Sequence, residues 1–356
     1  MLPQLSHAGE WFLRSGIQEP TGGVARYYRA DLGRNHAVST EITAYAASAL
    51  VYLHAATGER RYLDRAAAAA RFLVDAAWDP AARAMPFEVA PPEFIYFFDC
   101  GIVVRGLLAA WRATGCEELL GVATALGRSM ACDFAAPDGS FHPILALPGK
   151  RPLERDPQRW SRSAGCYQLK AALGWWELAD ATGDSSFREP YERLLESSLR
   201  TWGDFLPGHP DRHMVMDRLH AFLYFLEGLL PRAADKRCAA ALCEGIRHTA
   251  HYLHEIAPDF ARSDVYAQLL RMRIYADGAG VAPLDRAAAG DEAEKLAGFQ
   301  AAGGDTRTAG GFYFGRKGGA LAPFLSPVST AFAIEALALW DECRGGPAPA
   351  RPGFPM

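Results

Sequence analysis

The sequence HAVSTEITAYAASALVYLHAATGERRYLD (residues 36–64) predicts a helical hairpin: an apolar helix, a tight turn and the start of a more polar helix. Ser39 and Thr40 supply hydroxyl groups before the first helix, and Glu41 lies in its first turn, which is a typical helix start. Gly58 follows the last apolar turn. Glycine at this position is a typical stop signal, because it readily adopts the left-handed conformation that closes a helix.

The turn of this hairpin recurs in the chain. Ala56-Thr57-Gly58-Glu59 returns as Ala113-Thr114-Gly115-Cys116 and as Ala181-Thr182-Gly183-Asp184. Each copy follows an apolar helix and precedes a more polar one. Six apolar helices are predicted in all, starting near Ser39, Asp99, Ser163, Asp217, Asp264 and Ser329. Each has a more polar partner if the N-terminal helix at residues 4–15 is paired with the last one.

A helix that is apolar nearly all round must be buried on more than one side. Alternation of such helices with half-buried ones, about every 45–65 residues, indicates a repeat architecture. We therefore predict an all-α (α/α)6 barrel, or toroid, of six inner and six outer helices, with short β pieces in the loops at one end. The predicted domain spans residues 1–344, and a loose tail rich in Pro and Gly spans residues 345–356. An open α-solenoid is the alternative, but long irregular loops before the inner helices argue against uniform stacking.

Composition excludes several classes of protein. The chain has 356 residues, a net charge of −4, 50% hydrophobic residues and 22% charged residues. A large core is expected, and neither nucleic-acid nor membrane binding is expected. Seven scattered cysteines without CxxC spacing and an N-terminus without a secretory signal pattern predict a cytoplasmic protein. The sequence indicates no cofactor and gives no oligomeric state.

The repeated Ala-Thr-Gly turn, the Asp138-Gly139-Ser140-Phe141 turn before an inner helix and the count of twelve helices resemble the six-hairpin glycosidase superfamily. The resemblance covers roughly residues 4–343. This superfamily contains glycoside hydrolases, sugar epimerases of the N-acylglucosamine 2-epimerase type and domains of polysaccharide lyases. The resemblance therefore implies the (α/α)6 fold and an activity on carbohydrates, without selecting one reaction. The aspartate-rich motif of class II terpene cyclases, which use a related barrel, is absent.

Carboxyl groups begin four of the six inner helices: Glu41, Asp99, Asp217 and Asp264. Acidic residues are favoured at helix starts by capping and by the helix dipole, but inner helices that start at one end bring these groups together. Glycoside hydrolysis needs one protonated and one ionised carboxyl group. Glu41 and Asp99 are the first predicted pair, because they occupy equivalent positions on adjacent hairpins. Tyr96 belongs to an aromatic run before Asp99 that is expected to raise the pKa of its carboxyl group.

His220 and Tyr167 support a different chemistry. His220 lies three residues after Asp217 on the predicted helix, so that both can share one face. His220 could then act as a base beside a uronate carboxylate, with Tyr167 as the acid, in a lyase or an epimerase. Cys100 and Cys166 could join His220 in a zinc site, as in lanthionine cyclases, but the tryptophan-cysteine and cysteine-histidine-glycine motifs of those enzymes are missing. No metal site is therefore predicted.

Basic and aromatic residues in the loops before the inner helices predict the substrate. Arg34 precedes His36 in one such loop, and Trp160 and Arg162 lie in another. Arginine binds carboxylates through two hydrogen bonds, and aromatic rings stack on sugars. The residues predicted to bind substrate are His36, Tyr96, Arg162, Trp160, Asp217, Asp264 and Arg34. The first hypothesis is a glycoside hydrolase that acts on an acidic glycan, the second a lyase or epimerase, and the third a glycan-binding barrel without activity.

Overall fold

The computed structural model describes residues 3–156, 159–344 and 346. Its secondary structure is mainly helical, with twelve α-helices and three short three-stranded sheets in these residues. The chain forms two compact units. Unit 2 comprises Gln18–Arg26 and His36–Thr201, and unit 1 comprises Met1–Ile17, Tyr27–Asn35 and Trp202–Met356. Nearly all of the predicted tail lies outside the described residues.

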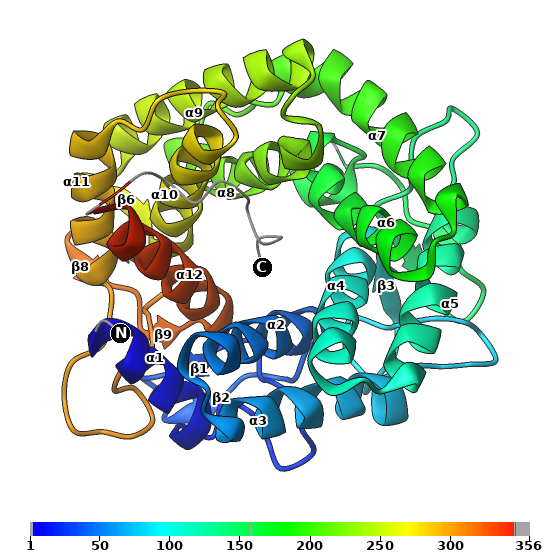
Figure 1. Cartoon of the computed structure of the whole chain (residues 1–356), viewed down its shortest axis with the longest axis horizontal. Helices are drawn as coiled ribbons and strands as arrows, with labels where there is room; N and C mark the ends of the chain where they lie inside the picture. Colours follow the sequence, from blue (N-terminus) through cyan, green and yellow to red (C-terminus); the bar gives the residue numbers. More distant parts are fainter. Residues whose placement is uncertain (1–2, 157–158, 345, 347–356) are drawn as a thin grey trace. The chain divides into compact units, whose positions relative to one another are not determined.

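Unit 2 contains three helical hairpins. Helices α2 (Thr40–Thr57), α4 (Phe97–Thr114) and α6 (Leu169–Thr182) pack side by side, and each is followed by a more polar helix: α3 (Arg60–Arg71), α5 (Glu117–Asp133) and α7 (Arg188–Thr201) (Figure 1). A π-helical segment, Phe72–Ala77, continues α3. Glycines in α4 let it lie close to both neighbours. A Cβ atom on Gly101 would come within 2.3 Å of the Ala171 carbonyl oxygen, and one on Gly106 within 2.7 Å of the Ala44 carbonyl oxygen.

The repeated Ala-Thr-Gly turn closes α2, α4 and α6 in the same way. Gly58, Gly115 and Gly183 have φ values of 74°, 70° and 73°, and each N–H donates to a carbonyl group of the preceding helical turn. The threonine before each glycine donates to a carbonyl four residues earlier. It also accepts from the N–H two residues later. This local pattern explains why the turn could be recognised from sequence.

Unit 1 also alternates inner helices with outer ones, but its inner helices do not end in the Ala-Thr-Gly turn. Helices α8 (Arg212–Leu229), α10 (Ser263–Gly278) and α12 (Pro327–Arg344) pack in order, with α9 (Lys236–Ile256), α11 (Arg286–Ala297) and α1 (Pro3–Arg14) behind them (Figure 1). The N-terminal helix α1 packs on α12, which confirms the predicted pairing of the first and last helices. The indole N–H of Trp11 donates to the Arg307 carbonyl at 3.0 Å, and the Gln300 amide donates to the Gln4 carbonyl at 2.8 Å.

Short antiparallel strands precede several helices. In unit 2, β3 (Phe94–Tyr96), β4 (Ile144–Ala146) and β5 (Arg151–Pro152) form one sheet, and β3 leads directly into α4. In unit 1, β6 (Phe260–Arg262), β7 (Gly315–Lys317) and β8 (Ala320–Leu321) form a second sheet, and β6 leads directly into α10. The third sheet joins β1 (Tyr28–Arg29), β2 (Arg34–Asn35) and β9 (Phe324–Leu325). The strands therefore determine where α4 and α10 begin.

Two predicted helix starts were wrong. Helix α8 begins at Arg212, five residues before Asp217, because the Asp211 carboxylate accepts from the His213 N–H and caps the helix there. Asp217 is therefore in the second turn. Helix α6 begins at Leu169 and not near Ser163, since a 3-10 turn, Cys166–Gln168, comes before it.

Candidate active site

Glu41 and Asp99 lie in the first turns of the neighbouring helices α2 and α4. The Ser39 hydroxyl caps α2 by accepting from the Ile42 N–H, so that Glu41 is not needed as a cap. Asp99 is only 6% exposed, and its Oδ2 atom is buried without a hydrogen-bond partner in the described residues. Glu41 is half-buried and makes no hydrogen bond or ion pair with another described residue. Neither carboxyl group is therefore explained by local structure.

The electrostatics separate the roles of the two carboxyl groups. Burial raises the pKa of Glu41 to about 7, against the opposing positive charges of Arg26 and Lys170. Burial, and then the negative charge of Glu41, raise the pKa of Asp99 well above its ordinary value. Like charges that share a buried site cannot both ionise easily, so one of the pair retains its proton. At neutral pH the expected arrangement is a protonated Asp99 beside a partly ionised Glu41.

Two cations act on this pair. Arg26 lies 4.8 Å over the Phe87 ring, and its guanidinium contacts Glu88 Oε1 at 3.3 Å. Lys170 is fully buried in α6, and its Nζ lies 5.2 Å from the centre of the Tyr45 ring. Sequence reasoning missed Lys170. The available signal was a lysine in a helix that is otherwise apolar nearly all round, because a buried charge requires a specific partner.

Tyr96 is the last residue of β3 and precedes α4. Its half-buried ring packs on Phe87 at 5.1 Å. Burial, and then the charge of Asp99, raise the pKa of Tyr96, and Arg26 and Arg162 oppose this shift. The Nε atom of Arg162 is buried without a hydrogen-bond partner in the described residues. Tyr96 and Arg162 therefore lie within electrostatic range of each other in unit 2, and Arg162 retains an unused donor.

Tyr167 and Trp160 pack against each other, with ring centroids 5.0 Å apart. The Tyr167 hydroxyl donates to the Ser163 carbonyl at 3.1 Å. Burial raises the pKa of Tyr167 further above its ordinary value. The proton of this hydroxyl is already engaged by the backbone, and the raised pKa makes Tyr167 a weaker acid, which weakens its case as a proton donor to substrate.

In unit 1, Asp264 and Asp217 converge on Arg262, and His220 contacts Asp264. Arg262 holds both oxygens of Asp264, at 3.0 and 2.6 Å, and donates to Asp217 Oδ1 at 2.7 Å. Burial acts to raise the pKa of Asp264, but the charges of Arg262 and His220 outweigh it and hold that pKa well below its ordinary value. Asp264 is thus an ionised partner of an arginine that was not among the predicted residues, and Asp217 is the second ion-pair partner of that arginine.

His220 is oriented by two polar groups. Its Nδ1 lies 3.0 Å from Gln268 Nε2 and 3.1 Å from Asp264 Oδ2. Nδ1 accepts from Gln268 when the neutral ring carries its proton on Nε2, and it donates to Asp264 when the proton is on Nδ1, the form that leaves Nε2 as a base. The ring also packs edge-on against Tyr224, 4.4 Å between centroids. This histidine–carboxylate arrangement is a second reactive group, situated in unit 1.

Several other basic residues in the loops are neutralised by nearby acids. Lys150 pairs with Asp133, Arg155 with Asp138, and Arg212 with Glu255. His36 and Arg34 are exposed. Within the described residues, Arg34 is in no ion pair. The sequence pattern thus overstated the free positive charge. Arg26 is the loop cation that acts on the carboxyl pair, and Arg162 acts on Tyr96.

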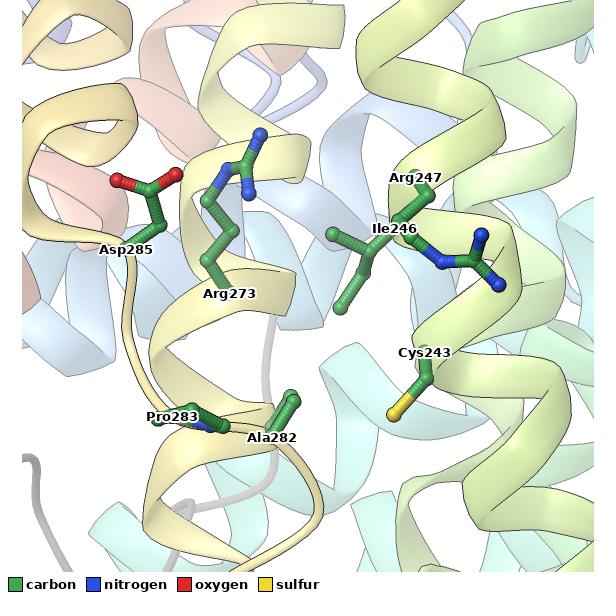
Figure 2. A pocket seen from close by; sticks show the side chains of 8 residues that line it. Cys243, Ile246, Arg247, Arg273, Ala282, Pro283 and Asp285 are labelled. Atoms are coloured by element: carbon green, nitrogen blue, oxygen red, sulfur yellow. The ribbon is translucent and has the colours of Figure 1, made fainter.

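A cavity of about 190 Å³ in unit 1 was also considered as a site. Figure 2 shows Arg273 and Arg247 on its walls, with Ile246 between them. The Arg273 Nε already donates to Glu292 at 2.9 Å. The two guanidinium groups do not converge, so this cavity offers no formed anion site.

Among residues 3–156, 159–344 and 346, no cluster of three or more His, Cys, Asp or Glu side chains could hold a metal ion. Across the same residues, the helices lack the combined length and apolar character that would be needed to cross a bilayer.

Comparison with known proteins gives a clear result only at the level of structure. No family model and no curated sequence matches the chain. The solved structure of cellobiose 2-epimerase from Spirochaeta thermophila DSM 6192 matches with a TM-score of 0.72 and 15% identity, over 95% of this chain and 94% of that one. A D-mannose isomerase matches with a TM-score of 0.68 and 11% identity, over 95% of this chain and 97% of that one. An α-amylase from Clostridium perfringens matches with a TM-score of 0.62 and 12% identity, over 94% of this chain and 97% of that one.

These likenesses show the fold. The predicted all-α (α/α)6 fold is confirmed. Identities of 11–15% carry no information on the reaction. The single domain at residues 1–344 stays a prediction.

Proposed function

We propose that this protein is a carbohydrate-active enzyme, most specifically a glycoside hydrolase that uses Asp99 as general acid and Glu41 as general base or nucleophile. One observation carries the proposal: two carboxyl groups without local partners begin adjacent helices, and their pKa values are both raised. Raised values are what proton transfer at neutral pH requires. The fold shared with enzymes whose names include an epimerase, an isomerase and an amylase is compatible with it.

The proposed reaction balances with these two groups alone. The bond between the anomeric carbon and the glycosidic oxygen breaks, and its electron pair goes to the oxygen, which takes the proton of Asp99. Glu41 removes a proton from the attacking water, or attacks the anomeric carbon itself in a retaining enzyme. Buried Lys170 and half-buried Arg26 favour the ionised form of Glu41. The rate should therefore rise as Glu41 ionises near pH 7 and fall again once Asp99 loses its proton.

We further propose that the substrate carries a carboxylate near the reacting bond. The unpartnered Nε of Arg162 and the weak contact of Arg26 with Glu88 at 3.3 Å support this proposal. An arginine donor that is buried without an acceptor favours an anionic ligand, because it otherwise loses its hydrogen bonds to water. Arg162→Gln should raise KM for a uronate substrate more than for its neutral counterpart.

The test compares two leaving groups in two variants. Asp99→Asn should lower kcat/KM about 10²–10⁴-fold on an unactivated oligosaccharide. It should have little effect on a glycosyl fluoride, because fluoride departs without protonation. Glu41→Gln should impair both substrates. Asp64→Asn is a matched control, since that carboxylate is 66% exposed on the same hairpin. Equal losses with both leaving groups in Asp99→Asn would contradict its role as the acid.

A second function is supported by His220. A histidine held at Nδ1 by Gln268 and Asp264 is suited to remove a proton next to a carbonyl group, as sugar epimerisation or isomerisation requires. Exchange of substrate hydrogen for deuterium in D₂O, lost in His220→Ala and kept in Glu41→Gln, would favour this reaction. If the protein binds a glycan but neither turns it over nor exchanges its hydrogen, a binding function without catalysis is favoured.

A further inference from the structure

Unit 2 contains a groove of about 860 Å³, and the residues that line it do not include the first turns of α2 and α4. One wall comes from residues 76–84, which begin at the end of the π-helical segment, and the other from residues 86–94 together with residues 146–148. The volume is within the range of pockets that enclose small ligands, about 300–1,000 Å³. Its walls are mostly alanine and proline, which gives the groove flat apolar surfaces.

The groove is braced by the backbone of its walls. Asp79 and Ala84 exchange backbone hydrogen bonds at 3.0 and 3.1 Å. The Phe87 N–H donates to the Phe94 carbonyl at 2.9 Å, and the Leu147 N–H donates to the Glu93 carbonyl at 2.8 Å. Each wall is thus internally hydrogen-bonded, and residues 93–94 are tied to strand neighbours. A ligand would find these surfaces already formed, which lowers the cost of binding.

Three side chains give the groove its chemistry. Trp78 and Phe94 are half-buried in the walls, and Trp78 has no hydrogen bond from its indole N–H to another described residue. Glu93 is exposed and makes no ion pair within the described chain. The charged residues on the lining are Asp79 and Glu93, both acidic. Aromatic faces beside carboxylates suit a ligand with apolar faces and many O–H donors, and they disfavour an anion.

Residues 84–94, which form part of the groove, also border the carboxyl pair. In this segment Pro86 and Phe94 line the groove, whereas Phe87 contacts Arg26 and Tyr96. The Thr40 hydroxyl, next to Glu41, donates to the Pro86 carbonyl at 2.8 Å. One loop is therefore shared by the groove and the candidate reaction centre. A long ligand with distinct units at the two places fits this arrangement better than an unrelated partner does.

We propose that this groove is a binding subsite for neutral sugar units of a glycan, with Trp78 as the stacking platform and Glu93 as an acceptor for sugar hydroxyl groups. The proposal rests on the carbohydrate activity proposed above and adds a substrate class: a glycan that carries neutral units next to its acidic ones. A proline-rich peptide is the competing occupant, because aromatic grooves also bind such peptides.

The test uses the full chain labelled with 5-fluorotryptophan. The ¹⁹F resonance missing from Trp78→Phe identifies Trp78. In the Asp99→Asn background, which prevents turnover, at least one of maltohexaose, cellohexaose, xylohexaose and mannohexaose should shift that resonance. Trp78→Ala should weaken binding of the same sugar at least tenfold by calorimetry. Trp78→Phe and Glu93→Gln serve as milder variants if Trp78→Ala does not fold.

The acidic charge of the groove allows a second, independent test of the proposal. Trigalacturonate should shift the Trp78 resonance less than the neutral sugar does, and Glu93→Gln should strengthen its binding. The proposal is overturned if no neutral hexasaccharide shifts the Trp78 resonance, if binding is unchanged in Trp78→Ala, or if a polyproline peptide alone produces the shift. If the Trp78 resonance shifts but the wild-type protein turns over no glycan, the hydrolase is rejected and the subsite is kept.

Discussion

At the scale of single residues, Asp99 and Glu41 occupy positions that a stable protein ordinarily gives to neutral groups. Asp99 has a buried oxygen without a partner, and burial raises the pKa of both side chains. A carboxyl group whose pKa is raised in the folded state lowers stability at high pH, because folding then buries a charge. Retention of two such groups on adjacent helices is better explained by chemistry than by stability.

Glu41→Gln is predicted to stabilise the protein at high pH. The pKa of Glu41 is about 7 in the folded protein, against an ordinary value of 4.5. The favourable contribution of its neutral form is complete below pH 4.5 and is lost as pH rises through 7. Glutamine stays neutral, so at pH 8 the variant should be more stable by about 2 kcal/mol, allowing for partial exposure. Urea unfolding at pH 4 and pH 8 measures the difference.

The pH dependence distinguishes this effect from a general change in packing. The gain should disappear near pH 4, where Glu41 is protonated in both states. Asp64→Asn, on the exposed face of the same hairpin, should change stability by less than about 0.5 kcal/mol at either pH. A Glu41→Gln variant that is less stable than the wild type at pH 8 would show that its charge is well accommodated, and would remove the electrostatic argument for the site.

At the scale of helices, the helix ends that are set by residues a few positions away could be predicted from the sequence. Helix ends without such a local signal could not. The Ser39 cap and the left-handed Gly58 both act within a few residues, and α2 has the predicted bounds. Helix α8 begins earlier than predicted, because Asp211 caps it from within a loop that has no apolar pattern. Helix α4 begins at Phe97, close to the predicted Asp99, but the pairing of β3 with β4, about 50 residues later in the chain, was not predicted. Pairing across such a distance leaves no local signal.

The repeated turn gives a quantitative prediction. Gly115 has φ 70° and no atom within 4 Å of the position of a Cβ, so that Gly115→Ala introduces backbone strain without a steric clash. The left-handed conformation should cost about 1–2 kcal/mol. Gly121→Ala in α5 is the control. It also meets nothing within 4 Å, has ordinary helical φ, and should gain about 0.5–1 kcal/mol. Thermal unfolding of both variants measures whether each substitution lowers or raises the stability of the protein. Equal effects would mean that the turn conformation adds nothing.

At the scale of the whole molecule, periodicity was enough for the fold but not for the electrostatics of the site. The alternation of apolar and polar helices is a property of the whole chain, and it predicted the (α/α)6 fold that the comparisons show. Glu41 and Asp99 could be proposed because each is next to a helix start. Lys170 and the pairing of Lys150 and Arg155 with nearby acids could not, because these charges find partners through folding.

The N-terminal helix provides the last prediction, since its partners lie about 300 residues away in sequence. Trp11 is 1% exposed, its indole donates to the Arg307 carbonyl, and Gly311 packs directly against its ring. Trp11→Ala should cost about 3–5 kcal/mol through the cavity it leaves. Hydrogen exchange should accelerate in α12 and residues 300–314 of unit 1 more than in α2 and α4 of unit 2. Arg14→Ala, at a side chain 70% exposed, should change neither. Equal acceleration in α4 and α12 would mean that the two units do not unfold separately, so that the helix supports the whole chain and not unit 1 alone.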